Sequence, residues 1–186
     1  MMAAEFCLVP GVLIALPQLR DENFERSVIM MIEHTEQGAL GLVINRSTSQ
    51  QCSAVTDSFE LAWPGPLDEP LRRGGPVEAN GLWMLHDDGW CFDETMRVVD
   101  GLAVSRSREA LTRMCNGHEE RLRLYVGYAG WGAGQLEQEI AEGSWLTAPA
   151  SPAMIFDWPA EEIWVRSIGA LGIRPEQLID AGSTIQ

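Results

Sequence analysis

The sequence LYVGYAGWGAGQLEQEI, residues 124–140, joins an apolar run to a short amphipathic pattern. Residues 124–126 suit a buried β-strand, and Leu136 and Ile140 lie one turn apart on the same face of a helix. Glycines at positions 127, 130, 132 and 134 separate the two patterns. Because glycine lets the backbone come close to another group, this junction predicts tight contact with a ligand, a partner or another strand.

The glycine spacing does not match a dinucleotide-binding fingerprint, which needs Gly-x-Gly-x-x-Gly and a later strand that ends in an acidic residue. An anion site at the start of the helix is physically available, but Glu137 and Glu139 already supply negative charge there. Close strand-to-helix packing, with Trp131 over the glycines, is the structural alternative. A pocket for a ligand without phosphate, lined by Tyr128, Trp131 and Gln135, is the functional one.

Strand patterns come first along the chain, and helical patterns enter in the second half. Turn residues at 35–38 favour an antiparallel hairpin over residues 28–45. Ser107 suits the N-cap of a helix over 108–115, and Pro159 suits the start of a helix over 160–171. This order predicts an α+β fold with a mixed, mostly antiparallel sheet. The expected strands are 12–16, 27–34, 40–45, 82–86, two short pieces within 97–104, 122–126, 145–147 and 154–156.

The chain, residues 1–186, is expected to form a single domain, because no repeat or linker composition divides it. Residues from about 47 to 66 are rich in serine, threonine, proline and glycine, and predict a flexible segment. The tail from about residue 182 is expected to fray, since chain ends seldom find packing partners.

Charge limits the classes of partner. The formal net charge is -14, and all thirteen basic residues are arginines. Such a surface repels nucleic acid and anionic lipid, so direct nucleic-acid binding is not expected. Arginines at 106, 108, 113, 121 and 123 are interspersed with glutamates, and suggest either a solvated face with ion pairs or a phosphate-binding patch.

The N-terminal residues and the cysteines indicate a cytoplasmic protein. No basic residue precedes the first apolar run, which is also too short to cross a membrane, so neither a signal peptide nor a membrane segment is expected. The four cysteines lie far apart and form no CxxC pair. This spacing favours reduced thiols over disulfides or a structural zinc site.

His34 and His86 are the candidate general bases, because each lies at a predicted strand end beside carboxylates. A histidine held by a backbone partner at a sheet edge is the structural alternative. Metal binding by these histidines with Asp87 and Cys91 lacks close ligand spacing, so neither a metal nor a cofactor is expected.

A set of short motifs occurs in order between about residues 11 and 180: Asp21-x-Asn23-Phe24-x-x-Ser27-Val28, Glu33-His34, Gly38-Ala39-x-Gly41-Leu42-Val43-Ile44-Asn45-Arg46, Gly74-Gly75-Pro76-Val77, Leu85-His86, and Gly127-Tyr128-Ala129-Gly130-Trp131-x-x-Gly134-Gln135-Leu136-Glu137-x-Glu139-Ile140. Together they resemble the AlgH/YqgE family of small, mostly bacterial proteins of undefined biochemical role. The resemblance implies one α+β domain whose bifurcated sheet forms a pseudo-barrel, and no established enzyme activity. The family name implies a role in regulating alginate production. The chain departs from the family pattern at 181–184, where Ala-Gly-Ser-Thr replaces an Ala-Gly-His finish, and at Glu22, where proline is usual.

We expect a binding or regulatory protein, rather than an enzyme, with a groove near the glycine-rich junction. Its expected partner is another protein or a small molecule, and the chain is expected to be a monomer or a weak dimer. The alternative is a hydrolase or transferase that uses His34 or His86 as base, with Asn45, Gln135 and Glu139 orienting the substrate. A DNA-binding transcriptional regulator is a third class, based on the family name and the local arginines. The expected binding residues are His34, Asn45, Tyr128, Gly130, Trp131, Gln135 and Glu139.

Overall fold

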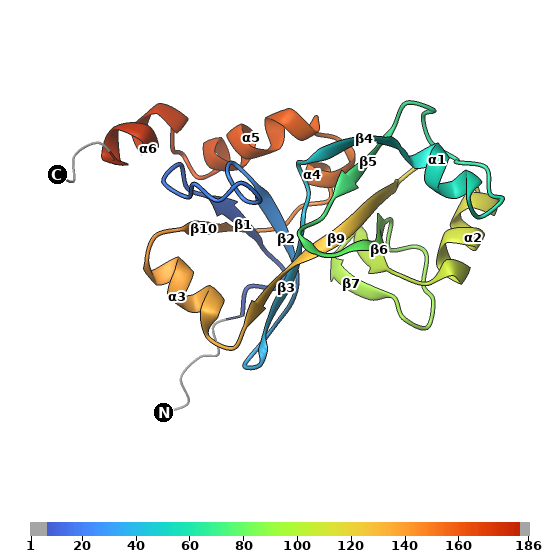
Figure 1. The fold of residues 1–186 in the computed structure, drawn as a ribbon, viewed down its shortest axis with the longest axis horizontal. Coiled ribbons are helices and arrows are strands. Elements are labelled where there is room, and N and C mark those ends of the chain that lie inside the picture. Colours follow the sequence, from blue (N-terminus) through green and yellow to red (C-terminus); the bar gives the residue numbers. More distant parts are fainter. Residues whose placement is uncertain (1–6, 183–186) are drawn as a thin grey trace.

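A ten-stranded sheet runs through residues 7–182, the part of the chain that the computed structural model describes (Figure 1). The strands follow the order β10-β1-β2-β3-β9-β6-β8-β7, and a branch of β4 and β5 joins the sheet at β9. Nearly all pairs are antiparallel, but β5 and β9 are parallel. The strands are β1 (Val12–Ala15), β2 (Val28–Thr35), β3 (Gly38–Val43), β4 (Ser47–Gln51), β5 (Pro70–Arg73), β6 (Val77–His86), β7 (Met96–Val99), β8 (Leu102–Ser105), β9 (Leu122–Gly132) and β10 (Trp145–Ala148).

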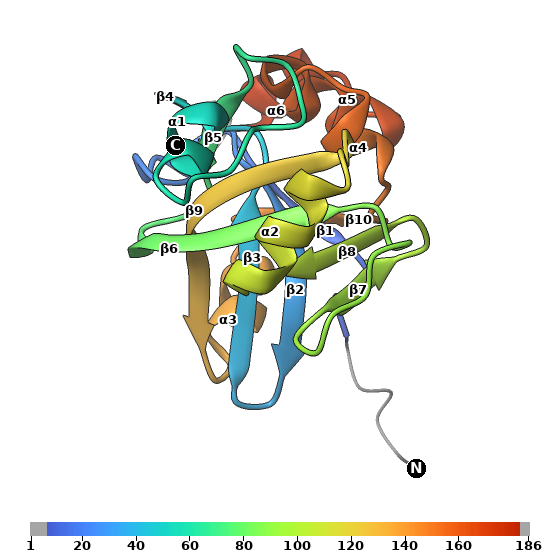
Figure 2. The same ribbon diagram turned by 90° about the vertical axis from the view of Figure 1, so that its right-hand side faces the viewer.

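The helices cover separate parts of this sheet (Figures 1 and 2). α3 contacts β3, β9 and β10, whereas α5 contacts β1 and β2. α2 begins after Ser107, whose hydroxyl accepts a hydrogen bond from the Ala110 N–H as the sequence predicts. The helices are α1 (Cys52–Asp57), α2 (Arg108–Asn116), α3 (Gln135–Ala141), α4 (Ala153–Phe156), α5 (Ile163–Ala170) and α6 (Pro175–Gly182), with a 3-10 turn at Ala160–Glu162 before α5.

β9 holds the two parts of the sheet together. Its first half pairs with β6 on residues 82–86 and with β5 on residues 72–73, while its second half pairs with β3 on residues 38–41. The sheet changes partners around Gly127, which has a left-handed backbone (φ 70°) that glycine adopts without steric cost. The sheet is therefore bifurcated at β9, and its main path stays open between β10 and β7.

The strands bury apolar side chains on both faces. On β2, Val28 and Met30 belong to a core shared with α5, while Ile29 and Met31 belong to a second core under α3. A third core lies between α2 and the strands β6 and β9. This alternation follows from the two-residue period of a strand, and it explains why the strands read as continuous apolar runs.

The α+β class and the mixed, mostly antiparallel sheet are confirmed, but two local predictions differ from the structure. Residues 154–156, expected as a strand, lie in α4, where Met154 and Ile155 are buried. β9 continues through the glycines to residue 132, so the turn into α3 is much shorter than expected. Residues of about 47–66, whose flexibility stays a prediction, contain β4 and α1: β5 pairs with β4, and α1 buries Cys52 and Thr56. The expected fraying beyond 182 lies outside the described residues.

Candidate functional site

The turn between β9 and α3 is closed by a network of hydrogen bonds around Glu139. Its carboxylate accepts the indole N–H groups of Trp131 at 3.0 Å and Trp145 at 2.8 Å. The Gln135 amide donates to the other carboxylate oxygen at 3.0 Å, and the Gln135 carbonyl oxygen accepts the Gly132 N–H at 3.1 Å. Phe24 packs on both indoles. These polar groups hold α3 against the sheet, so Gln135 and Glu139 have a structural role here.

His34 links β2 to α3. Its Nε2 lies 2.7 Å from the Glu137 carboxylate, and its Nδ1 accepts the Leu8 N–H at 3.2 Å. Acceptance at Nδ1 places the proton of a neutral imidazole on Nε2, which therefore donates to Glu137. The pKa of Glu137 is lowered by the hydrogen bond from its own N–H and by the bond from His34. Because the lone pair on Nδ1 is occupied, a general-base role for His34 would require loss of the Leu8 contact.

Asn45 fastens the start of β2. Its side-chain oxygen accepts the Val28 N–H at 2.9 Å, and its side-chain nitrogen donates to the Arg26 carbonyl at 2.9 Å. Both ends of the amide are therefore engaged by the backbone.

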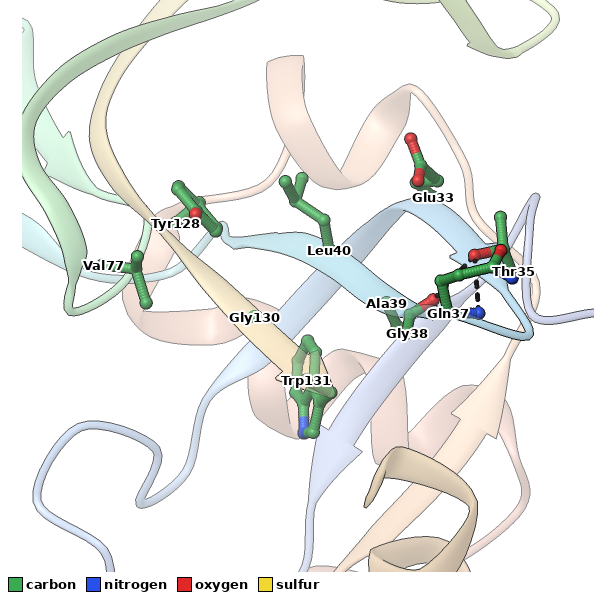
Figure 3. Close-up of a pocket in the computed structure, with 10 residues that line it drawn as sticks. All are labelled: Glu33, Thr35, Gln37, Gly38, Ala39, Leu40, Val77, Tyr128, Gly130 and Trp131. Carbon is green, nitrogen blue, oxygen red and sulfur yellow. Dashed lines mark hydrogen bonds between the residues drawn. The ribbon is translucent and has the colours of Figure 1, made fainter. Parts of the chain in front are cut away.

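An open groove lies on the sheet over β2, β3 and β9 (Figure 3), whose ends project beyond the neighbouring strands (Figure 2). Cross-strand pairing places Glu33 opposite Leu40, and Leu40 opposite Gly130. Gly130 contributes no side chain to this row, and Tyr128 and Val77 stand beside it. The groove has a volume of about 380 Å³ and is lined by Glu33, Thr35, Gln37, Gly38, Ala39, Leu40, Val77, Tyr128, Gly130 and Trp131.

Only some of the residues predicted to form the site therefore line the groove. Tyr128, Gly130 and Trp131 line the groove, whereas His34, Asn45, Gln135 and Glu139 do not. Sequence reasoning missed Glu33, Leu40 and Val77 as groove residues. The only signal for them was their presence in or beside the family motifs, because the register that brings them together involves strands far apart in the chain.

His86 lies in a different part of the sheet and is fully buried. Its Nδ1 is 2.8 Å from the Asp87 carbonyl oxygen, and its Nε2 is 2.8 Å from the Ser105 hydroxyl, which is 2.7 Å from the Thr95 hydroxyl. Burial lowers the pKa of His86, so the ring is neutral near pH 7. Thr95 lines a second pocket of about 290 Å³ with Asp88, Trp90, Cys91, Arg97 and Ala103.

The remaining sequence candidates do not form a shared site. Arg106 pairs with Glu78 and Arg113 with Glu109, whereas Arg121 and Arg123 both lie over Phe156. The arginines of residues 106–123 therefore do not converge on one site. Among residues 7–182, no group of three or more His, Cys, Asp or Glu side chains is placed to hold a metal ion. Within the same residues, no helix has the length and apolar composition needed to cross a membrane.

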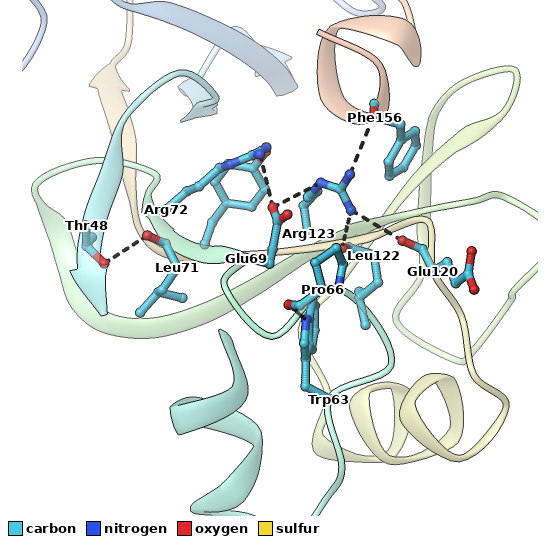
Figure 4. Close-up of polar contacts among 11 residues, drawn as sticks. Thr48, Trp63, Pro66, Glu69, Leu71, Arg72, Glu120, Leu122, Arg123 and Phe156 are labelled. Atoms are coloured by element: carbon cyan, nitrogen blue, oxygen red, sulfur yellow. Dashed lines mark hydrogen bonds and ion pairs between the residues drawn. The ribbon is translucent and has the colours of Figure 1, made fainter. Parts of the chain in front are cut away.

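A buried charge cluster, formed by Glu69, Arg72 and Arg123, lies where β5 meets β9 (Figure 4). One carboxylate oxygen of Glu69 lies 3.1 Å from Arg72 Nη2 and 3.2 Å from Arg123 Nε. Arg72 also donates to the Tyr125 hydroxyl at 3.2 Å. The Glu69 and Arg72 side chains are only 12% and 8% exposed, so this single carboxylate is the shared counter-ion of two guanidinium groups that have little access to water.

The protein is thus an α+β protein with a branched open sheet and a groove on β2, β3 and β9. The chain belongs to the AlgH-like family, whose model matches residues 12–176. It is 40% identical over 163 residues to a UPF0301 protein of Chlorobium luteolum, covering 86% of this chain and 84% of the relative. A UPF0301 protein of Ralstonia nicotianae is 40% identical over 169 residues, which is 89% of both chains.

Two solved structures share the fold. The solution structure of AlgH from Pseudomonas aeruginosa has a TM-score of 0.76 and 34% identity, and the match covers 96% of both chains. The crystal structure of a Corynebacterium diphtheriae protein has a TM-score of 0.78 at 24% identity, covering 95% of this chain and 94% of that one. The second likeness concerns the fold alone.

Proposed function

We propose that this chain is a non-enzymatic binding or regulatory protein whose ligand occupies the groove on β2, β3 and β9. The most direct support is that two polar side chains of the groove have no hydrogen-bond partner among the described residues. The Glu33 carboxylate and the Tyr128 hydroxyl form no hydrogen bond or ion pair within residues 7–182, whereas the network around Glu139 is internally satisfied. Polar groups that a fold leaves unpaired beside apolar surface are suited to contacts with a ligand.

The groove chemistry indicates a ligand with a cationic group next to an apolar one. Leu40 and Val77 supply apolar surface, with Val77 38% exposed, and Tyr128 adds an aromatic ring that can face a cation. Glu33 supplies a carboxylate at the opposite wall. The net charge of -14 would also steer a basic ligand toward the protein. A basic segment of a partner protein fits this description best.

The proposed setting is the cytoplasm. The cysteines at 7, 52, 91 and 115 are all free thiols, and two of them are buried, as expected for a protein that keeps its cysteines reduced. Direct DNA binding has little support, because the arginines are dispersed and the net charge opposes it.

Filling the groove tests the proposal. Gly130→Val is expected to weaken binding of a short lysine- and leucine-containing peptide by about tenfold or more, because its methyl groups occupy the space beside Tyr128. Fluorescence anisotropy of the labelled peptide gives the dissociation constant. Gly132→Val is the matched control on the same strand, since a Cβ there meets nothing closer than 4.0 Å and the position does not line the groove.

The charge requirement has its own control. The same peptide with glutamate in place of lysine is expected not to bind. Circular dichroism checks that the wild type and Gly130→Val are both folded. If the two folded proteins bind the basic peptide with equal affinity, the proposal is contradicted.

A hydrolase that uses His86 is the second candidate, favoured by the hydrogen-bonded chain from Thr95 through Ser105 to His86. Attack by the Thr95 oxygen on an acyl carbon would pass its proton to Ser105, and the Ser105 proton would pass to His86 Nε2. The bond from the acyl carbon to the alcohol or amine would then break, and the leaving group would take the proton back from His86 through Ser105. Water would hydrolyse the resulting ester on Thr95 and release the acid. Burial disfavours the imidazolium form of His86, which ranks this function second.

Substitution of Thr95, the first of these hydrogen-bonded hydroxyl residues, tests the hydrolase directly. If a panel of esters and amides reveals turnover, Thr95→Val should lower it by at least about 100-fold, because the attacking hydroxyl and its proton transfer are both lost. Unchanged turnover in Thr95→Val would show that these hydrogen-bonded hydroxyls take no part in the mechanism. Ser53→Ala, at a helix position outside the pocket, controls for general effects of losing a hydroxyl group.

A further inference from the structure

A small pocket beside the turn at 74–76 is lined by residues of three family motifs, and none of these residues lines the groove. Asn23 comes from the loop before β2, Arg46 from the segment between β3 and β4, and Gly75 and Pro76 from the turn between β5 and β6. Val43, Arg73 and Glu22 complete its lining. The free volume is about 30 Å³, which admits a group of a few atoms.

Arg46 is held in place by the loop that it faces. Its Nη1 donates to the Glu22 carbonyl oxygen and its Nη2 donates to the Glu25 carbonyl oxygen, both at 2.9 Å. A guanidinium group has five N–H donors, so further donors remain for a ligand after these two bonds. Because the side chain is already ordered, binding through it costs little additional conformational entropy.

Arg73 brings a second positive charge next to the first. The Arg73 N–H donates to the Arg46 carbonyl oxygen at 2.9 Å, which fixes the two residues as neighbours on adjacent segments. Within residues 7–182, the exposed Arg73 side chain forms no ion pair or hydrogen bond, in a protein where acidic residues outnumber basic ones by 27 to 13. The Asn23 side-chain amide is likewise without a hydrogen-bond partner among those residues.

We infer that this pocket binds a carboxylate group carried by a small acid or by a protein segment. Arg46 and Arg73 bring two positive charges and Glu22 brings one negative charge, so the lining is matched to a monoanion. A planar carboxylate fits the fork of a guanidinium group, and its second oxygen can accept from the Asn23 amide. The small volume favours a carboxylate over the bulkier phosphate, which also carries more charge.

Acetate is the probe for this site, titrated into the ¹⁵N-labelled full chain at constant ionic strength, with chloride and inorganic phosphate as comparison anions. Acetate is expected to shift the backbone amide resonances of Asn23 and Gly75 saturably, while chloride does not. Arg73→Gln is expected to weaken acetate binding by about tenfold, the usual scale of one hydrogen-bonded charge contact. Arg174→Gln removes the same charge from an exposed arginine outside the pocket, and is expected to change the affinity less than about twofold.

Three results would overturn the inference. They are the absence of saturable shifts, acetate binding that is unaffected in Arg73→Gln, and tighter binding of phosphate than of acetate. The groove variant Gly130→Val should leave acetate binding unchanged, so the carboxylate pocket and the groove are tested separately.

Discussion

Glu69→Gln is expected to lower the free energy of unfolding by about 3–5 kcal/mol, the range measured when one partner of a buried ion pair is removed. The Glu69 carboxylate is the anion shared by Arg72 and Arg123, at 3.1 Å and 3.2 Å. Glutamine keeps the shape of the side chain but removes its charge, so two guanidinium groups would remain together with little solvent between them. The loss in free energy of unfolding therefore measures the effect of the removed charge, because the packing changes little.

Urea denaturation followed by tryptophan fluorescence measures this loss. Asp68→Asn is the matched control, because it removes a carboxylate from the neighbouring, exposed position. Its effect is expected to stay within about 0.5 kcal/mol, as for most surface substitutions. A loss below about 1 kcal/mol in Glu69→Gln would show that the cluster is solvated like a surface ion pair.

Gly127→Ala is expected to destabilise the protein by about 2–5 kcal/mol, because it combines two costs. The backbone at Gly127 is left-handed (φ 70°), which any Cβ makes unfavourable. A Cβ there would also lie 2.3 Å from the Gly75 carbonyl oxygen, a backbone atom that cannot move aside like a side chain. β9 would have to separate from the turn at 74–76, which adjoins both the groove and the carboxylate pocket.

Gly134→Ala separates these two costs. Gly134 has nearly the same backbone angle (φ 74°), but a Cβ at that position meets nothing within 4 Å. This variant is expected to lose only the conformational cost of about 1–2 kcal/mol. Equal losses for the two variants in urea denaturation would mean that the close approach of Gly127 to Gly75 contributes nothing to stability.

Parts of the candidate site were predictable from residue type and local pattern. Tyr128, Gly130 and Trp131 were recognisable because glycines and aromatic residues alternate within one short segment. Four other candidates have polar side chains that can form hydrogen bonds either to a ligand or to the protein itself: His34, Asn45, Gln135 and Glu139. Their hydrogen bonds to Leu8, Val28, Gly132 and the two indoles gave them structural roles, and of these partners Leu8 and Val28 come from distant segments.

The sequence by itself determined the α+β class, the hairpin over 28–45 and the capped helix after Ser107, because these depend on the spacing of neighbouring residues. Only the tertiary structure decided how the glycine segment is used. Its backbone continues as a strand because β3, about half the chain length away in sequence, pairs with it, and Gly130 becomes part of a groove because that register sets it opposite Leu40. Register between distant strands depends on the packing of both faces of the sheet, and no local pattern specifies it.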